Sequence, residues 1–220
     1  MLDRIKEATR WRQKEAWHRI AASFFDGKGV VVDLGCGHGQ FLSYAPQNAI
    51  GLDWNEANLA VAEQTARKVL KGDVRALPFD NASIDGIHCS HVLEHLVPAD
   101  VHRVLAEIDR VLKPGGIFVV QAPLMWSGFY EDLTHVRPYP PGVIINYLCA
   151  HSGPRTLPVI ASSYEVVHLR WRYAPLRLRI RYVDGFLHRL NRWGFPWTKS
   201  NGYMLVLRKS SALKGSLTDQ

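Results

Sequence analysis

The sequence lacks any long apolar run. No stretch approaches the roughly 20 consecutive apolar residues that a membrane-spanning helix needs. The first residues, Met1 to Lys6, carry no apolar segment of the signal-peptide kind. Internal repeats and low-complexity tracts are absent as well. These absences argue against an integral membrane protein and a repeat protein, and they predict a cytoplasmic location.

Cysteine is scarce, with three residues in 220. Cys36, Cys89 and Cys149 lie far apart and show none of the spacings that bind zinc. We therefore expect reduced thiols, either in the core or in the wall of a site.

What the chain does have is enough apolar sequence for one α/β domain. Hydrophobic residues make up 47% of the 220, and single domains commonly reach about 250 residues. We expect one domain over residues 1–220, with a helical cap over 1–27, a core over 28–150 and a basic insertion over 170–200.

The organising stretch is an apolar strand followed by a glycine turn. Val30 to Leu34 is apolar except for Asp33, which is typical of a strand buried on both faces. Gly35, Gly37 and Gly39 follow at every second position. Glycines there allow a tight turn and let a ligand lie against bare backbone. A helix is expected to start near Gly39.

Two further acids follow at steps of about twenty residues. Asp53 ends the short segment Ile50 to Asp53, where a ribose-binding carboxylate is expected in a nucleotide-binding fold. Asp73 ends a third short segment. A lone G-x-G pattern is weak evidence, and the third glycine of a dinucleotide motif is misplaced here, so the ordered set carries the argument.

This ordered set resembles the class I S-adenosylmethionine-dependent methyltransferases over about residues 28–150. It includes the Leu-Pro-Phe-x-x-x-x-Ile-Asp segment and the Lys-Pro-Gly-Gly stretch before the fifth strand. The resemblance implies an α/β, doubly wound fold whose seven-stranded sheet is mostly parallel with an antiparallel last strand. It also implies S-adenosyl-L-methionine as cofactor and S-adenosyl-L-homocysteine as product.

The resemblance also assigns roles around the cofactor. Asp33 is expected near the ammonium end, Asp53 at the ribose hydroxyls and Asp73 at the adenine amine. Helix capping is the structural alternative for these acids. Gly35 and Gly37 would let the cofactor approach the turn, and Arg12 of the N-terminal helix would reach its carboxylate unless it only faces solvent. The remaining expected contacts are Trp54 stacking on adenine, the backbone amide of Val74 and the strand-end residue Ser90.

Helices are expected over residues 3–25, over 55–69 and from 99 to 112, with Asn55 capping the second. A short helix should also run from Gly39 to about Ala45, and another from Pro140 to Ala150. The later strands are expected at 84–90, 117–122, 164–169 and 203–208.

His91 and His95 have the i, i+4 spacing of a metal pair, but Glu94 directly precedes the second histidine, so the H-E-x-x-H motif is absent. His-Val-Leu-Glu-His-Leu resembles a segment of the same methyltransferases that begins a helical stretch beside the cofactor. We therefore expect a wall of the active site and no metal.

The loop after the fifth strand is rich in polar residues from Tyr130 to Tyr139. It resembles the Asp-x-Thr-His-x-Arg-Pro segment of methyltransferases associated with surface-polysaccharide genes, among others. His135 is a candidate general base for a hydroxyl acceptor, and Asp132 is a candidate to orient its ring. The alternative is that both residues only shape the loop.

The net charge of +7 is concentrated in the C-terminal third. Between His168 and Lys209 the only acid is Asp184, and the bases are Arg170, Arg172, Arg177, Arg179, Arg181, Arg189, Arg192, Lys199, Arg208 and Lys209. Aromatic residues interleave with these bases. The pattern suits peripheral contact with an anionic inner-membrane face, an RNA strip or a solvated basic face.

The sequence thus predicts a methyltransferase that acts on a small-molecule or glycan acceptor. A hydroxyl acceptor is favoured over a nitrogen because the Asn-Pro-Pro-Tyr signature of amino-methylating enzymes is missing. The resemblance of the loop makes a sugar of a surface glycan, or of its lipid-linked precursor, the first-choice acceptor. The alternatives are a tRNA or quinone-type methyltransferase and a non-catalytic cofactor-binding partner subunit.

Overall fold

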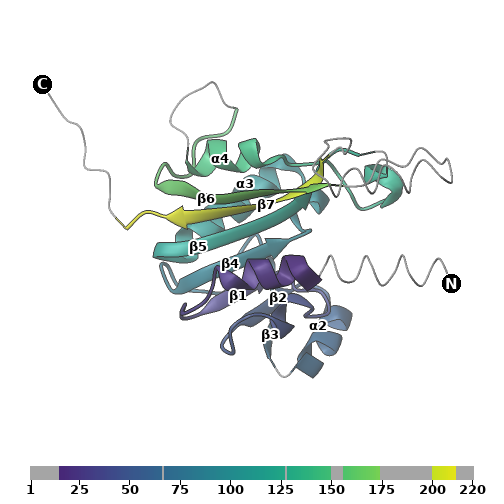
Figure 1. Cartoon of the computed structure of the whole chain (residues 1–220), viewed down its shortest axis with the longest axis vertical. Helices are drawn as coiled ribbons and strands as arrows, with labels where there is room; N and C mark the ends of the chain where they lie inside the picture. The colour runs from purple at the N-terminus through teal and green to yellow at the C-terminus, as the bar shows by residue number, and fades with distance from the viewer. Residues whose placement is uncertain (1–14, 66, 127, 150–155, 174–199, 212–220) are drawn as a thin grey trace, which may run out of the picture.

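A seven-stranded sheet in the order β3-β2-β1-β4-β5-β7-β6 forms the centre of the protein (Figure 1). The structure is a computed structural model that describes residues 15–65, 67–126, 128–149, 156–173 and 200–211. The strands are β1 (Val31–Leu34), β2 (Ile50–Asp53), β3 (Lys68–Lys71), β4 (Ile84–Ser90), β5 (Leu112–Pro123), β6 (Tyr164–Tyr173) and β7 (Ser200–Lys209).

Strand direction follows the expected pattern. β1 pairs in parallel with β2 and β4, and the parallel ladder continues through β3 and β5. β7 is antiparallel to both of its neighbours, β5 and β6. The predicted doubly wound sheet with an antiparallel last strand is therefore confirmed.

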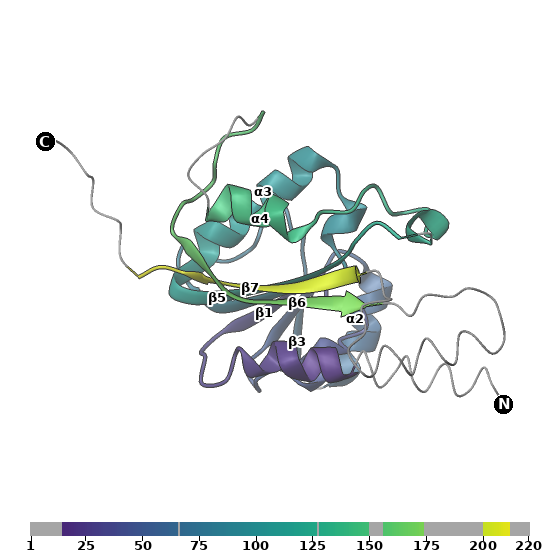
Figure 2. The same ribbon diagram turned by 45° about the horizontal axis from the view of Figure 1, so that its top comes forward.

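Helices cover both faces of the sheet (Figure 2). α3 (Pro98–Val111) and α4 (Pro141–Leu148) lie on one face, and α2 (Glu56–Ala62) lies on the other with a helix over residues 15–23. This layering gives two clusters of buried apolar side chains, one for each face.

α3 shows how the apolar period produces that packing. Val101, Val104, Leu105 and Ile108 recur every three or four residues, and each is at most 3% exposed. Burying each such side chain contributes about 1.5–3 kcal/mol before the entropy of ordering is subtracted. These side chains belong to the same buried cluster as Ile87 and Cys89 of β4, so α3 packs against that strand.

The expected helix from Gly39 to Ala45 is wrong. The structure has only a single 3-10 turn there, η1 (Phe41–Ser43). Gly35, Gly37 and Gly39 all adopt a positive φ, and the Gly39 N–H donates to the Cys36 carbonyl. The chain therefore stays in consecutive turns, which leaves too few residues for a helix.

The helix predicted over residues 55–69 is shorter in the structure. Asn55 caps α2 as expected, because its side chain accepts from the Ala57 N–H. α2 ends at Ala62, however, and Val69 pairs with Gly51 inside the sheet. A Val-Leu pair suits a strand on a pleated sheet better than an exposed helix end.

Two other expected boundaries also shift. His91 has a φ of 57°, so no helix begins there, and the 3-10 turn η3 starts at Leu93. β5 begins at Leu112 instead of residue 117, with a register shift opposite Ile84 and Gly86. The Pro-Gly-Gly stretch expected to precede the strand thus lies within it as an irregularity.

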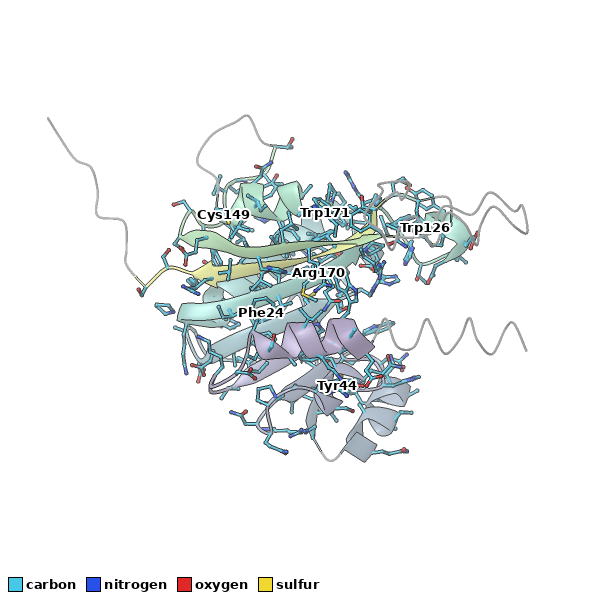
Figure 3. All side chains as sticks on the ribbon, viewed as in Figure 1. Phe24, Tyr44, Trp126, Cys149, Arg170 and Trp171 are labelled. Atoms are coloured by element: carbon cyan, nitrogen blue, oxygen red, sulfur yellow. The ribbon has the colours of Figure 1, made fainter. Side chains whose placement is uncertain are left out.

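The N-terminal helix packs across the sheet toward β6. Phe24 lies 5.5 Å from His168 between ring centroids, and the Arg170 guanidinium carbon lies 5.9 Å from the Trp17 ring centroid. Figure 3 labels Phe24 and Arg170 in this region.

Two predicted features, Arg12 and most of the basic insertion (174–199), lie outside the described residues. Within the described part, no helix is long and apolar enough to span a bilayer.

Candidate active site at the carboxyl edge of the sheet

The expected site residues meet where the parallel strands end. β1 is followed by the glycine turn, β2 ends at Asp53, β3 leads to Asp73 and β4 ends at Ser90. Because these strands are parallel, their carboxyl ends share one edge, the usual ligand position of an open α/β sheet. The loop that follows β5 projects beyond the same edge, and Trp126 marks it in Figure 3.

The glycine turn presents open backbone at this edge. Gly37 has a φ of 52°, and a Cβ built there meets nothing within 4 Å. Gly35 also has a positive φ, and a Cβ on it would overlap Cγ2 of Val92. The turn therefore needs glycine for two reasons, conformation at both positions and close contact at Gly35.

Asp53 fixes the turn to β2. Its Oδ2 accepts from the Gly37 N–H at 2.9 Å, and its Oδ1 accepts from the Asn55 N–H at 2.9 Å. The residue is 5% exposed. An ionised carboxylate has about four lone-pair positions, so two backbone bonds leave acceptor capacity for a ligand hydroxyl.

Asp33 pairs with His88, a residue that the sequence did not single out. Its Oδ1 lies 2.7 Å from Nδ1 of His88, and the two residues are 3% and 1% exposed. Phe41 stacks on the His88 ring at 3.7 Å between centroids. The only sequence signal was a polar residue inside the apolar fourth strand. The structure thus places Asp33 beneath the turn in a buried pair.

Asp73 is also occupied. Its carboxylate accepts from Arg75 Nε at 3.0 Å and Nη2 at 2.7 Å, and Arg75 reaches on to Asp100 at 3.2 Å. Hydrogen bonding to Arg75 lowers the pKa of Asp73. Val74, directly after Asp73, packs partly buried against the core. Trp54 is 78% exposed at the same edge.

Cys36 lines the turn from inside. The thiol is buried, and this burial, followed by the charges of Asp33 and Asp53, raises the pKa of Cys36 to about 12. The expectation of a reduced thiol in a site wall agrees with the free, buried state of this residue.

His135 and Asp132 lie together in the loop after β5. Nδ1 of His135 is 2.6 Å from the Phe129 carbonyl oxygen, and its Nε2 is 3.9 Å from Oδ2 of Asp132. A carbonyl only accepts, so Nδ1 carries the hydrogen and Nε2 keeps its lone pair. The backbone carbonyl of Phe129, which sequence reasoning missed, therefore holds the ring.

Asp132 itself is bound by Thr134. Its Oδ1 accepts from the Thr134 hydroxyl at 2.7 Å and from the Thr134 N–H at 2.9 Å. These bonds lower the pKa of Asp132, the hydroxyl contributing most. Asp132 is therefore ionised near neutral pH beside the outer nitrogen of His135.

The η3 turn (Leu93–His95) connects this loop to the glycine turn. Val92 lies so close to Gly35 that a Cβ there would overlap its Cγ2. The Glu94 carbonyl accepts from the Val136 N–H at 2.8 Å. His91 Nδ1 lies 2.8 Å from Glu94 Oε1, and Arg172 of β6 donates to His91 Nε2 at 3.3 Å. The segment expected to line the site therefore contacts both the glycine turn after β1 and the loop after β5.

Comparison with known proteins agrees with this geometry. Residues 32–120 match the family described as "Methyltransferase domain". A phthiotriol/phenolphthiotriol dimycocerosates methyltransferase of Mycobacterium tuberculosis is 35% identical over 114 residues, which is 46% of this chain and 40% of that protein. The chain thus matches less than half the length of this curated relative.

Solved structures share the fold across most of the chain. A S-adenosylmethionine-dependent methyltransferase from Archaeoglobus fulgidus has a TM-score of 0.66 at 23% identity, covering 90% of this chain and 94% of its own. The [4+2]-cyclase SpnF has a TM-score of 0.61 at 19% identity, covering 90% and 81%.

Residues 32–120 therefore match a methyltransferase domain, and the described chain shares the Rossmann-like fold of S-adenosylmethionine-dependent methyltransferases. S-adenosylmethionine is the cofactor that this domain implies. The residues at the carboxyl edge fit it, because Asp53 retains acceptor capacity beside the unobstructed backbone of Gly37.

Proposed function

We propose that the chain transfers the methyl group of S-adenosylmethionine to a hydroxyl of a sugar, in a surface glycan or its lipid-linked precursor. The observation that carries the proposal is the free Nε2 of His135, in a loop at the ligand edge, with Nδ1 bonded to the Phe129 carbonyl. A hydroxyl acceptor needs such a lone pair, because it must lose a proton as it gains a methyl group.

The cofactor would lie against the glycine turn. Its ribose hydroxyls would donate to Asp53, and its amino acid end would approach Gly35 and Gly37. Trp54 would cover the adenine, with the Val74 amide and Ser90 nearby. Asp33, Asp73 and Arg12 complete the proposed set. Asp33 and Asp73 would act through or beside His88 and Arg75, their present partners.

The reaction itself needs alignment more than activation. Bound S-adenosylmethionine would supply the methyl group, its C–S bond breaking as the acceptor oxygen bonds to the methyl carbon. Nε2 of His135 would take the proton that the acceptor hydroxyl loses. Asp132, 3.9 Å from that nitrogen, would stabilise the imidazolium, and S-adenosylhomocysteine would be the leaving group.

Two observations bear on the acceptor. The name of the mycobacterial relative refers to a lipid substrate, which supports a lipid-linked acceptor over a soluble one. Arg172 at the ligand edge adds positive charge beside His91, which suits a phosphate of a lipid-linked saccharide, and equally tRNA.

A non-catalytic role is the alternative of another class. The fold is shared with a protein named a cyclase, so the fold alone does not fix the reaction. A partner subunit that only holds the cofactor would bind it without turnover.

The experiment begins with calorimetry of the chain with S-adenosylmethionine. It then measures release of S-adenosylhomocysteine on glycan, lipid and tRNA fractions. We expect binding, and turnover on the lipid-linked saccharide fraction. Binding without turnover on any fraction would favour the partner subunit, and turnover on tRNA alone would replace the proposed acceptor.

The His135→Asn variant tests the base. The Asn amide can keep the hydrogen bond to the Phe129 carbonyl while Nε2 is lost. We expect turnover to fall about 10²–10⁴-fold with cofactor affinity unchanged. His102→Asn, on α3 and bonded to the Pro158 carbonyl, is the matched control. Equal turnover in both variants would reject His135 as the base.

A further inference from the structure

Three potential metal ligands converge where the η3 turn meets the loop after β5. One ligand atom from each of Glu94, His95 and His135 lies within 4.8 Å of the other two. His91 and His95, the pair that sequence spacing suggested, are not the pair brought together. His135 comes from a segment forty residues away, so local spacing could not reveal it.

Glu94 has a carboxylate oxygen without a partner. The residue is 0% exposed, and its Oε1 is engaged by His91 at 2.8 Å. Its Oε2 is buried and has no hydrogen-bond partner among the described residues. An unsatisfied buried carboxylate oxygen is unfavourable, and a bound cation would offset this cost.

Both histidines are held with an outer lone pair. The Thr134 hydroxyl gives its one hydrogen to Asp132, so it accepts from Nδ1 of His95, which lies 2.8 Å away. His135 donates from Nδ1 to the Phe129 carbonyl at 2.6 Å. In each ring Nε2 is therefore the nitrogen left to bind. Metal-binding histidines are commonly oriented in this way, by a bond from the second ring nitrogen.

We infer that Glu94, His95 and His135 form a binding site for a divalent first-row transition-metal ion, with Zn²⁺ the best match. Two imidazoles and one carboxylate are a ligand set of zinc sites that keep an open position. Ligands on bonds of about 2.1 Å lie at most about 4.2 Å apart, and the three residues already bring one ligand atom each within 4.8 Å of the others. The ion would join η3 to the loop after β5.

This inference does not rest on the proposed reaction. Nε2 of His135 can bind either the ion or a proton. Metal binding would therefore exclude the proposed role of His135 as general base. The ion would instead act as a Lewis acid at its open position. The test therefore reads binding and not turnover.

The full chain is stripped with a chelator and titrated with ZnCl₂ by calorimetry, and with CoCl₂ by visible absorption. We expect one ion per chain and ligand-field bands from bound Co²⁺. His95→Ala and His135→Asn should each weaken Zn²⁺ binding by more than the roughly 10–100-fold seen for outer-shell changes. His102→Ala should bind as the wild type does.

Glu94 is fully buried, so Glu94→Gln is checked first by thermal unfolding and circular dichroism. The two histidine variants decide the question even if this variant unfolds, because His95 and His135 are only partly buried. Absence of stoichiometric Zn²⁺ binding would overturn the inference. So would Zn²⁺ affinity equal to the wild type in both histidine variants.

Discussion

At the scale of single residues, the site depends on backbone that carries no side chain. Gly37 combines a positive φ with open space in front of it, and its N–H is held by Asp53. A methyl group there would stand where the cofactor is proposed to lie. Gly115 has the same two properties, a φ of 78° and nothing within 4 Å of a built Cβ. It lies near the amino end of β5, away from the carboxyl edge that carries the glycine turn.

Gly37→Ala and Gly115→Ala form a matched pair. Each should lose about 1 kcal/mol of stability, because alanine is strained at positive φ. Only Gly37→Ala should also weaken S-adenosylmethionine, by at least about 10-fold in Kd. Unfolding by urea and calorimetry measure the two effects. Similar affinity in both variants would place the cofactor elsewhere.

Asp53→Asn tests the proposed ribose contact. Asparagine replaces one acceptor oxygen by an NH₂ group that faces an N–H of Gly37 or Asn55. We expect a loss of about 1.5–3 kcal/mol in cofactor binding, the contribution of a hydrogen bond to a charged group. The exposed Asp26→Asn is the control. Unchanged affinity in Asp53→Asn would remove Asp53 from the site.

The cysteines should resist alkylation. Burial raises the pKa of Cys36 to about 12 and that of Cys149 to about 11, and it also raises the pKa of Cys89. The thiolate is the reactive form, and a raised pKa keeps it scarce below about pH 11. We expect little iodoacetamide adduct by mass spectrometry at pH 8, and three adducts after denaturation. Rapid labelling of the folded protein would contradict this.

At the scale of elements, an ion-pair network ties α3 to the turn before β4. Glu107 pairs with Arg110 at 2.7 Å and accepts from the Leu77 N–H at 2.7 Å. Arg110 also donates to the Phe79 and Leu77 carbonyls. Arg110 is the main cause of the lowered pKa of Glu107.

This network makes the stability of the folded protein depend on pH. Because the folded pKa of Glu107 lies below its usual value of 4.5, its stabilisation is present above about pH 4.5 and is lost as the pH falls through the folded value. Glu107→Gln should be less stable at pH 7 by about 1–3 kcal/mol and lose less on acidification. Urea unfolding at pH 7 and pH 4 measures both. Parallel losses would show that Glu107 does not contribute.

The elements also show what a sequence can and cannot predict. The sequence located strands that are mostly apolar, such as β1 and β4, and it located α3 with its regular apolar period. The prediction of a helix after Gly39 was wrong because three alternating glycines with positive φ outweigh the general strand-turn-helix pattern. Local patterns carry no information on partners far along the chain. Hence the Asp33–His88 pair and the Glu94, His95 and His135 cluster were visible only in the structure.

At the scale of the whole molecule, β6 ends and β7 begins at the ligand edge of the sheet. β6 runs parallel to β5, and β7 returns beside it, with Tyr173 paired to Ser200. Tyr173 and Ser200, the described residues on either side of 174–199, therefore lie at the edge that carries the glycine turn. Contact of the basic insertion with an anionic membrane, one of the three possibilities that its composition allows, would start from this edge.

Replacing residues 174–199 by a short Gly-Ser linker tests this contact. The paired ends can be closed by a few residues, since loop-closure entropy changes slowly with length. We expect cofactor affinity within about 2-fold of the wild type and loss of sedimentation with anionic liposomes. A replacement of the same length that keeps the charges but not the aromatic residues is the control. Retained sedimentation in the short variant would reject the membrane contact.

The pairing of Tyr173 with Ser200 also makes the connection exchangeable. A segment whose two ends are neighbours can change in length and content without moving either strand. Exchanging residues 174–199 between related chains is therefore expected to leave β6, β7 and the glycine turn in place.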